Sequence, residues 1–133
     1  MSAKETLIAE LREHALVLGE VTLTSGATAS YYVDAKRAIL RQPGFAALGE
    51  LVAAEARRRD AQAVGGMTMG ADPIASAALA GAGGEDLLAF FVRKEKKAHG
   101  LGRQLEGGFA PGQTVALVED TTTTGGSTLE ALE

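Results

Sequence analysis

Three short apolar runs, each followed by a glycine-rich or charged loop, restrict the fold more than any other feature of this chain. The runs occupy residues 61–64, 87–92 and 114–118. Continuous apolar runs of this length, bounded by turn residues, are typical of strands that are buried on both faces. Residues 44–59 and 74–82, which lie between or before these runs, carry apolar or small residues at helical spacing. The alternation predicts an α/β domain with a parallel sheet flanked by helices.

Shorter patterns predict the elements at the two ends of the chain. Apolar residues at helical spacing predict an N-terminal helix over residues 6–17, and Gly19 is expected to end it as a cap. Two short strands are expected at residues 21–24 and 31–34, and a last helix at residues 127–133. The N-terminal part therefore combines one helix with a small pair of strands.

Two segments after the predicted strands are expected to be loops with a function. Asp72 and Pro73 end a glycine-rich stretch and are expected as the N-cap and the first residue of the following helix. Residues 95–112 form a polar, glycine-spaced stretch, and structureless loops of this length are uncommon unless they are functional or disordered. In parallel sheets, ligands bind beyond the carboxyl ends of the strands, so these loops are predicted to form one site.

Length, composition and charge exclude several classes of protein. A chain of 133 residues with 46% hydrophobic and 23% charged residues supports a single folded domain. The absence of cysteine excludes disulfides and thiolate chemistry, and two histidines are too few for a multi-histidine zinc site. No apolar run is long enough for a membrane helix, and the first residues resemble an amphipathic helix and not a signal peptide. The net charge of −4 gives no general attraction to nucleic acid or membranes, and a cytoplasmic protein is predicted.

Residues 115–127 carry the strongest functional signal. Glu119 and Asp120 directly follow a buried run, and a threonine-glycine loop then leads into a predicted helix. Backbone N–H and hydroxyl groups in such a loop can bind phosphate, and the carboxylates can bind ribose hydroxyls or a hydrated Mg²⁺. The segment matches neither a Walker loop nor a dinucleotide-binding glycine motif. An ordinary connection with exposed acids is the alternative, but adjacent acids repel one another and four consecutive threonines are unusual in a plain turn.

A cluster of cations follows the second apolar run. In an acidic protein, such a cluster at the end of a buried strand favours a binding site for a dense anion such as diphosphate. The alternative is a solvated charge run with no ligand. The cluster comprises Arg93, Lys94, Lys96, Lys97, His99 and Arg103.

These motifs resemble those of a known enzyme family. Residues 115–127 are similar to the signature of type I phosphoribosyltransferases, except that Thr121 and Thr122 replace the usual apolar pair. Residues 93–100 resemble the mobile-loop signature of orotate phosphoribosyltransferases in particular.

Two more segments extend the resemblance over nearly the whole chain. Residues 22–34 are similar to the N-terminal substrate segment of the orotate enzymes, and residues 65–73 to their diphosphate loop. The resemblance implies one phosphoribosyltransferase domain over residues 1–133, with an N-terminal hood over residues 1–43 and an α/β core over residues 44–133.

The resemblance also implies a reaction and its residues. The family transfers ribose 5-phosphate from 5-phosphoribosyl 1-diphosphate to orotate, giving orotidine 5'-phosphate and diphosphate in pyrimidine biosynthesis, with Mg²⁺ as cofactor. In the family, the mobile loop reaches into the site of the neighbouring subunit, so Lys97 and His99 would act across a homodimer. No nucleic-acid or membrane partner is expected. Lys97, Glu119 and Asp120 would be the catalytic residues, and Thr123 would contact orotate. The residues implied to bind the donor are Arg93, Lys94, Lys97, His99, Glu119, Asp120, Thr121, Thr122, Thr123, Thr124, Gly125, Gly126 and Ser127.

The sequence also departs from the family pattern. Thr24 stands where some members have a lysine, and the chain stops at Glu133, before the further strands and the orotate-binding arginine of family members. We therefore expect a chain that is truncated at its C-terminus. A donor-binding or regulatory protein of the same fold, or an inactive fragment, are the alternatives to an active transferase.

Overall fold

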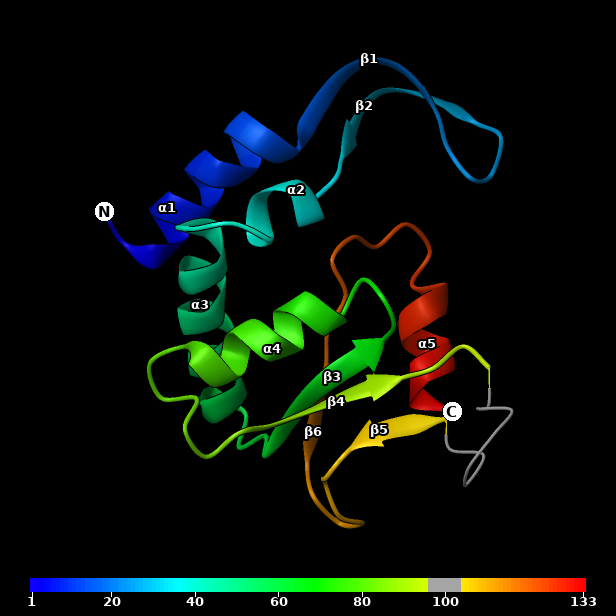
Figure 1. The fold of residues 1–133 in the computed structure, drawn as a ribbon. Coiled ribbons are helices and arrows are strands. Elements are labelled where there is room, and N and C mark those ends of the chain that lie inside the picture. Colours follow the sequence, from blue (N-terminus) through cyan, green and yellow to red (C-terminus); the bar gives the residue numbers. More distant parts are fainter. Residues whose placement is uncertain (96–103) are drawn as a thin grey trace.

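A four-stranded sheet forms the centre of the protein in a computed structural model that describes residues 1–95 and 104–133 (Figure 1). The strand order is β5-β4-β3-β6. The strands span Ala63–Met67 (β3), Leu88–Val92 (β4), Leu105–Gly107 (β5) and Val115–Leu117 (β6). Strand β3 pairs in parallel with β4 on one side and β6 on the other, whereas β5 pairs antiparallel with β4. The predicted parallel sheet is confirmed.

The register brings the carboxyl ends of the three parallel strands together. Met67 at the end of β3 pairs with Val92 at the end of β4, and Gly65 pairs with Leu117 at the end of β6. The chain therefore leaves these strands at one edge of the sheet, where the loops that follow them can meet.

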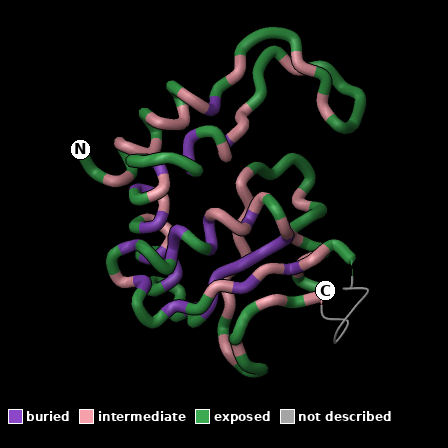
Figure 2. The backbone as a smooth tube through the Cα atoms, in the orientation of Figure 1, coloured by how far each residue is buried: buried purple, intermediate pink, exposed green. Residues whose placement is uncertain are grey.

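Helices cover both faces of the sheet. Successive side chains of a strand point to opposite faces, so each strand contributes to both helix contacts. Helices α3 (Gly44–Arg58) and α4 (Asp72–Ala80) bury small side chains such as Ala53 and Ala75 against Val64 on one face. On the other face, Ala131 of helix α5 (Gly126–Leu132) and Phe109 pack on the cluster that contains Phe90. Every residue of β3 is buried, as the purple segment in Figure 2 shows.

The N-terminal elements lie beyond the carboxyl edge of the sheet (Figure 1). They are helix α1 (Ala3–Glu10), the π-helical turn η1 (Leu11–Ala15), strands β1 (Leu16–Thr22) and β2 (Thr28–Val33), and the short helix α2 (Lys36–Ile39). Ser2 and Glu5 form a capping box that fixes the start of α1. Strands β1 and β2 pair antiparallel, and most of their residues are exposed.

Several boundary predictions were wrong. The strand expected at residues 31–34 begins at Thr28, because Thr28 and Ala29 pair with β1. The first helical stretch ends at Ala15, because Leu16 to Leu18 pair with β2, and Gly19 is part of strand β1 and not a helix cap. Strand β3 continues to Met67 because Gly66 and Met67 pair with β4. Residues 95–112 contain the short strand β5, and Asp72 is the first residue of α4, with Ala71 in the N-cap position.

Among the described residues, no helix is long and apolar enough to cross a membrane.

Helices α3 and α4 approach so closely that Gly49 has no room for a side chain. A Cβ atom at Gly49 would collide with the carbonyl oxygen of Ala77, which is part of the α4 backbone. Gly49→Ala should therefore lower the free energy of unfolding, because overpacking costs about 1–3 kcal/mol, more than the ~1 kcal/mol that alanine gains in an open helix. Urea denaturation measures the difference. Ala54→Gly, at an exposed position of α3, gives the effect of helix propensity alone, and a stabilised Gly49→Ala variant would contradict the close packing.

Candidate functional site

Glu119 and the predicted threonine loop line a pocket at the carboxyl edge of the sheet, and Asp120 lies next to Glu119 in the sequence. Strand β6 ends at Leu117, and Glu119 and Asp120 follow it directly. Gly125, with a φ of 82°, turns the chain into α5, and the N–H of Gly126 donates to Thr124 Oγ1 at 3.3 Å. Such a positive φ favours glycine at this position. The residues that line the pocket are Glu119, Thr121, Thr122, Thr123, Thr124, Gly125, Gly126, Ser127 and Thr128.

Each of the two carboxylates accepts a hydrogen bond from the backbone of the next residue. Glu119 Oε1 accepts a hydrogen bond from the backbone N–H of Asp120 at 3.0 Å, and Asp120 Oδ1 accepts one from the N–H of Thr121 at 3.0 Å. The other oxygen of Asp120, Oδ2, lies 2.6 Å from the ammonium nitrogen of Lys36 on α2. The Asp120 side chain is only 8% exposed, whereas Lys36 is 35% exposed. The local backbone and one distant cation therefore fix the orientation of Asp120.

The loop after β3, the strand next to β6, lies against the acid pair. A Cβ atom at Gly70 would collide with Asp120 Oδ1 and Glu119 Oε1, so the bare backbone of Gly70 lies against both carboxylates. Thr68 Oγ1 donates to the carboxylate of Asp72 at 3.0 and 3.1 Å, which links the loop to the start of α4. The loop that was predicted to bind diphosphate and the acid pair thus form one continuous site.

The environment separates the pKa values of the two acids. Burial, together with the neighbouring Asp120, raises the pKa of Glu119 above its ordinary value. Burial alone would also raise the pKa of Asp120, but hydrogen bonds with Glu119 and Lys36 outweigh it and lower that pKa. The hydrogen bond to Asp120 raises the pKa of Lys36 in turn. Asp120 is thus the more strongly ionised acid, and Glu119 the one that binds a proton more readily.

The structure places the predicted cations only in part. Arg93 follows β4, and its Nε lies 3.1 Å from Glu106 Oε1 on β5. Lys94 is exposed at the same edge of the sheet. Lys96, Lys97, His99 and Arg103 lie outside the described residues. Arg93 and Lys94 therefore follow β4 at the carboxyl edge of the sheet, where the Arg93 side chain pairs with Glu106 of β5.

The contacts of Lys36 and Gly70 with the acid pair were not predicted from the sequence. Lys36 is 84 residues away from Asp120 in the sequence and has no motif around it that points to the acid pair. Gly70 lies in the predicted loop, but its contact with the carboxylates depends on the tertiary packing of β3 and β6. The pairing of β3 with β6 brings Gly70 to the acid pair, and the tertiary contact of α2 brings Lys36 there.

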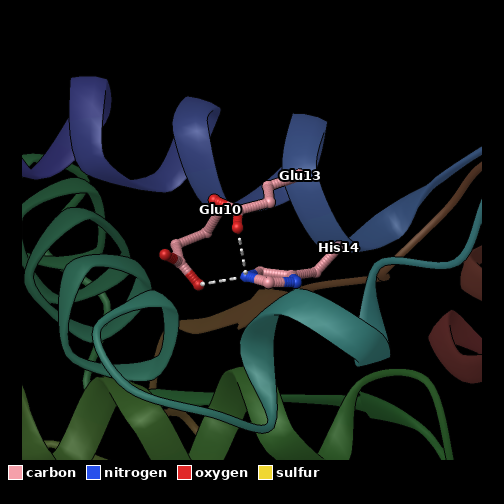
Figure 3. A group of neighbouring side chains, drawn as sticks. All are labelled: Glu10, Glu13 and His14. Carbon is pink, nitrogen blue, oxygen red and sulfur yellow. Dashed lines mark ion pairs between the residues drawn. The ribbon is translucent and has the colours of Figure 1, made fainter.

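A second charged group lies on the N-terminal helical stretch (Figure 3). His14 Nε2 lies 3.6 Å from Glu10 Oε2 and 3.8 Å from Glu13 Oε1. Arg41 Nε lies 3.8 Å from Glu10 Oε2, and Arg41 Nη1 lies 3.3 Å from His14 Nδ1. The Arg41 guanidinium places a positive charge beside Glu10, so this group joins the N-terminal helical stretch to the segment before α3 as an ion-pair network.

Glu119 gives a prediction for the pH dependence of stability. Its raised pKa means that its contribution to the free energy of unfolding is fully favourable below the ordinary value of 4.5 and is lost as the pH rises through the raised value. Glu119→Gln removes this titration and the repulsion with Asp120. Urea denaturation should therefore show the variant gaining stability relative to the wild type between about pH 4 and about pH 8.

Glu55→Gln is the matched control for this measurement. Hydrogen bonds from Arg58 and Arg59 lower the pKa of Glu55 to about 2, so its ionised form favours folding. The control variant should lose stability relative to the wild type as the pH rises from about 2 to about 4.5, which is the opposite trend. A Glu119→Gln difference that is equal at both pH values would contradict the raised pKa.

Comparison with known proteins supports one family. No family model matches the sequence. The orotate phosphoribosyltransferase of Corynebacterium glutamicum (strain R) is 46% identical over 132 residues, which are 99% of this chain and 71% of the relative. That of Streptomyces avermitilis is 48% identical over 129 residues, 96% of this chain and 71% of the relative. This chain thus spans about seven-tenths of the length of these relatives.

Solved structures agree with the sequence comparison. The Mycobacterium tuberculosis H37Rv orotate phosphoribosyltransferase in complex with Fe(III) dicitrate has a TM-score of 0.82 and 44% identity, and covers 98% of this chain and 73% of its own. The same enzyme in complex with 5-phospho-alpha-D-ribosyl 1-diphosphate has a TM-score of 0.78 and 38% identity, with 98% and 72% covered. The sequence identity, the shared fold and the acid pair above its threonine-lined pocket lead to one conclusion: this chain belongs to the orotate phosphoribosyltransferase family.

Proposed function

We propose that this chain transfers ribose 5-phosphate from 5-phosphoribosyl 1-diphosphate to orotate. In this reaction, N1 of orotate forms a bond with C1 of the ribose while the bond from C1 to the diphosphate oxygen breaks. The products are orotidine 5'-phosphate and diphosphate. Membership of the family and the crystallised relative that binds the same donor support the proposal.

The acid pair beside the threonine-lined pocket is the observation that carries the proposal. A phosphorylated ribose needs donors for its phosphate and acceptors for its hydroxyl groups, and this pocket has both. We assign the ribose hydroxyls to Glu119 and Asp120. The lowered pKa of Asp120 supports this role, because an ionised carboxylate is a strong acceptor and also stabilises positive charge on the ribose ring.

The remaining residues are assigned by their place around the acid pair and by the family motifs. The 5-phosphate would bind the loop of Thr121, Thr122, Thr123, Thr124, Gly125, Gly126 and Ser127, and Thr123 would also contact orotate. Arg93 and Lys94, which follow β4 at the same edge, would bind the diphosphate. Lys97 and His99, outside the described residues, are assigned to the diphosphate by the loop motif alone.

Mg²⁺ fits the donor set as the cofactor of this reaction. Hard carboxylate oxygens are the protein ligands that Mg²⁺ prefers, and it usually keeps several waters and binds substrate phosphates as well. Glu119 and Asp120 would hold the hydrated ion. When bound, it would neutralise charge on the leaving diphosphate.

A homodimer and a cytoplasmic location complete the proposal. The loop motif supports a dimer in which Lys97 and His99 act in the site of the partner subunit. The chemistry of the donor supports the cytoplasm, since a sugar that carries both a phosphate and a diphosphate does not cross a membrane unaided.

The first test is turnover by the chain and by an acid variant. With donor and Mg²⁺, the wild type should consume orotate, measured by the fall in its absorbance. Asp120→Asn should lower kcat/KM roughly ten- to hundredfold, because a hydrogen bond to a charged group contributes about 1.5–3 kcal/mol. Glu55→Gln, which changes an exposed acid outside the site, should leave kcat/KM unchanged.

The same assay separates the enzyme from its alternatives. Donor binding by calorimetry without turnover would replace the transferase with a donor-binding protein. If the chain shows no turnover and does not bind the donor, the proposed function is contradicted.

Mixing two inactive variants tests whether the loop acts across a dimer. Lys97→Ala and Asp120→Asn each damage every site of their own homodimer. If Lys97 serves the partner's site, a mixed dimer contains one site with both residues intact. Subunit exchange between equal amounts should then restore about a quarter of wild-type activity, because half of the dimers are mixed and each has one intact site. No recovery after verified exchange would place Lys97 in the site of its own subunit.

A further inference from the structure

Lys36 is a charged residue at the site that neither the sequence motifs nor the proposed chemistry uses. It lies at the start of α2, in the N-terminal part of the chain, and its Nζ lies 2.6 Å from Asp120 Oδ2. Of the ion pairs between described residues, this one joins the most distant parts of the sequence, because its partners are 84 positions apart. The contact connects the N-terminal elements directly to the acid pair.

The surroundings of Asp120 give Lys36 a specific task. Asp120 Oδ1 is fixed by the N–H of Thr121, and the backbone of Gly70 lies against the same oxygen. Within the described part of the chain, Lys36 is the one residue that donates a hydrogen bond to Oδ2. Because the side chain is 92% removed from solvent, few water molecules are available to replace the ammonium group. Loss of Lys36 would leave a nearly buried carboxylate with one oxygen unpaired.

We propose that Lys36 is a positioning residue that fixes the Asp120 carboxylate in the orientation that binds the ribose of the donor. The proposal rests on the proposed function, since it concerns the acid assigned to the ribose hydroxyls. Lys36 acts through Asp120: its ammonium group fixes Oδ2, and the free lone pairs of the carboxylate then point in a constant direction.

A direct contact between Lys36 and the donor is the competing explanation. A lysine ammonium has three N–H donors, and the Asp120 contact uses one of them. The side chain is 35% exposed, so a ligand can reach it. The two explanations differ in one respect: a positioning residue loses its effect when Asp120 is neutral, whereas a direct ligand keeps it.

A double-mutant cycle separates the two. Lys36→Met keeps the length of the side chain and removes the charge, and it should raise the KM for the donor roughly ten- to hundredfold, while the KM for orotate changes little. In an Asp120→Asn background, the same substitution should change the donor KM less than about twofold. Lys36→Arg, which keeps the charge, should restore most of the donor affinity. Lys4→Met, at an exposed position of α1, is the matched control and should resemble the wild type.

Calorimetry measures how tightly each variant binds the donor, and thermal unfolding shows whether each variant is folded. Equal effects of Lys36→Met in the two backgrounds, or donor binding unchanged by Lys36→Met, would overturn the proposal. If Lys36→Met fails to fold, Lys36→Arg and the Lys36→Met/Asp120→Asn pair supply the test, because neither leaves Asp120 charged and unpaired. In that case the double variant should bind the donor as Asp120→Asn alone does, and further weakening would overturn the proposal. A wild type without turnover but with Lys36-dependent donor binding would contradict the transferase activity and leave the role of Lys36 intact.

Discussion

The site depends on a strand, β3, that is buried on both faces and paired on both edges. Its central residues are glycines, and their missing side chains let the neighbouring elements approach. A Cβ atom at Gly65 would collide with Phe90 of β4, and one at Gly66 would lie 2.8 Å from the Cβ of Ala71. The carbonyl of Gly65 also accepts a hydrogen bond from Val118 at 2.9 Å, which carries the pairing with β6 up to the acid pair. Close packing around β3 therefore sets the positions of both the loop at Gly70 and the carboxylates.

The parts of the fold that could be predicted from the sequence are those with a strong local pattern. The apolar runs predicted the three parallel strands, because a strand that is buried on both faces is a continuous apolar run in the sequence. The acid pair and the threonine loop were recognised because their chemistry is contiguous in the sequence, and Glu119 and the threonine loop line one pocket in the structure. Whether each of these residues has the assigned role remains a prediction.

The parts that could not be predicted depend on tertiary contacts. Strand β5 has only three residues, Leu105 to Gly107, and forms because the edge of β4 offers hydrogen bonds and not because of its own pattern. Leu16 and Leu18 continue the apolar spacing of the preceding helix, yet they pair with β2. The contact between Lys36 and Asp120 has no sequence signal at all, since a lone lysine at the start of a short helix is ordinarily a solvated residue.

The two acids illustrate how one site can supply two kinds of carboxylate. They are adjacent in the sequence, but only Asp120 has a cation within hydrogen-bond distance among the described residues, and its pKa falls while that of Glu119 rises. Two equally ionised neighbours would repel each other without a ligand present. Lys36 relieves this repulsion from the N-terminal side of the molecule, so the geometry of the acid pair depends on how the N-terminal elements are seated. The N-terminal segment is thus coupled to Asp120 by a contact that no local motif encodes.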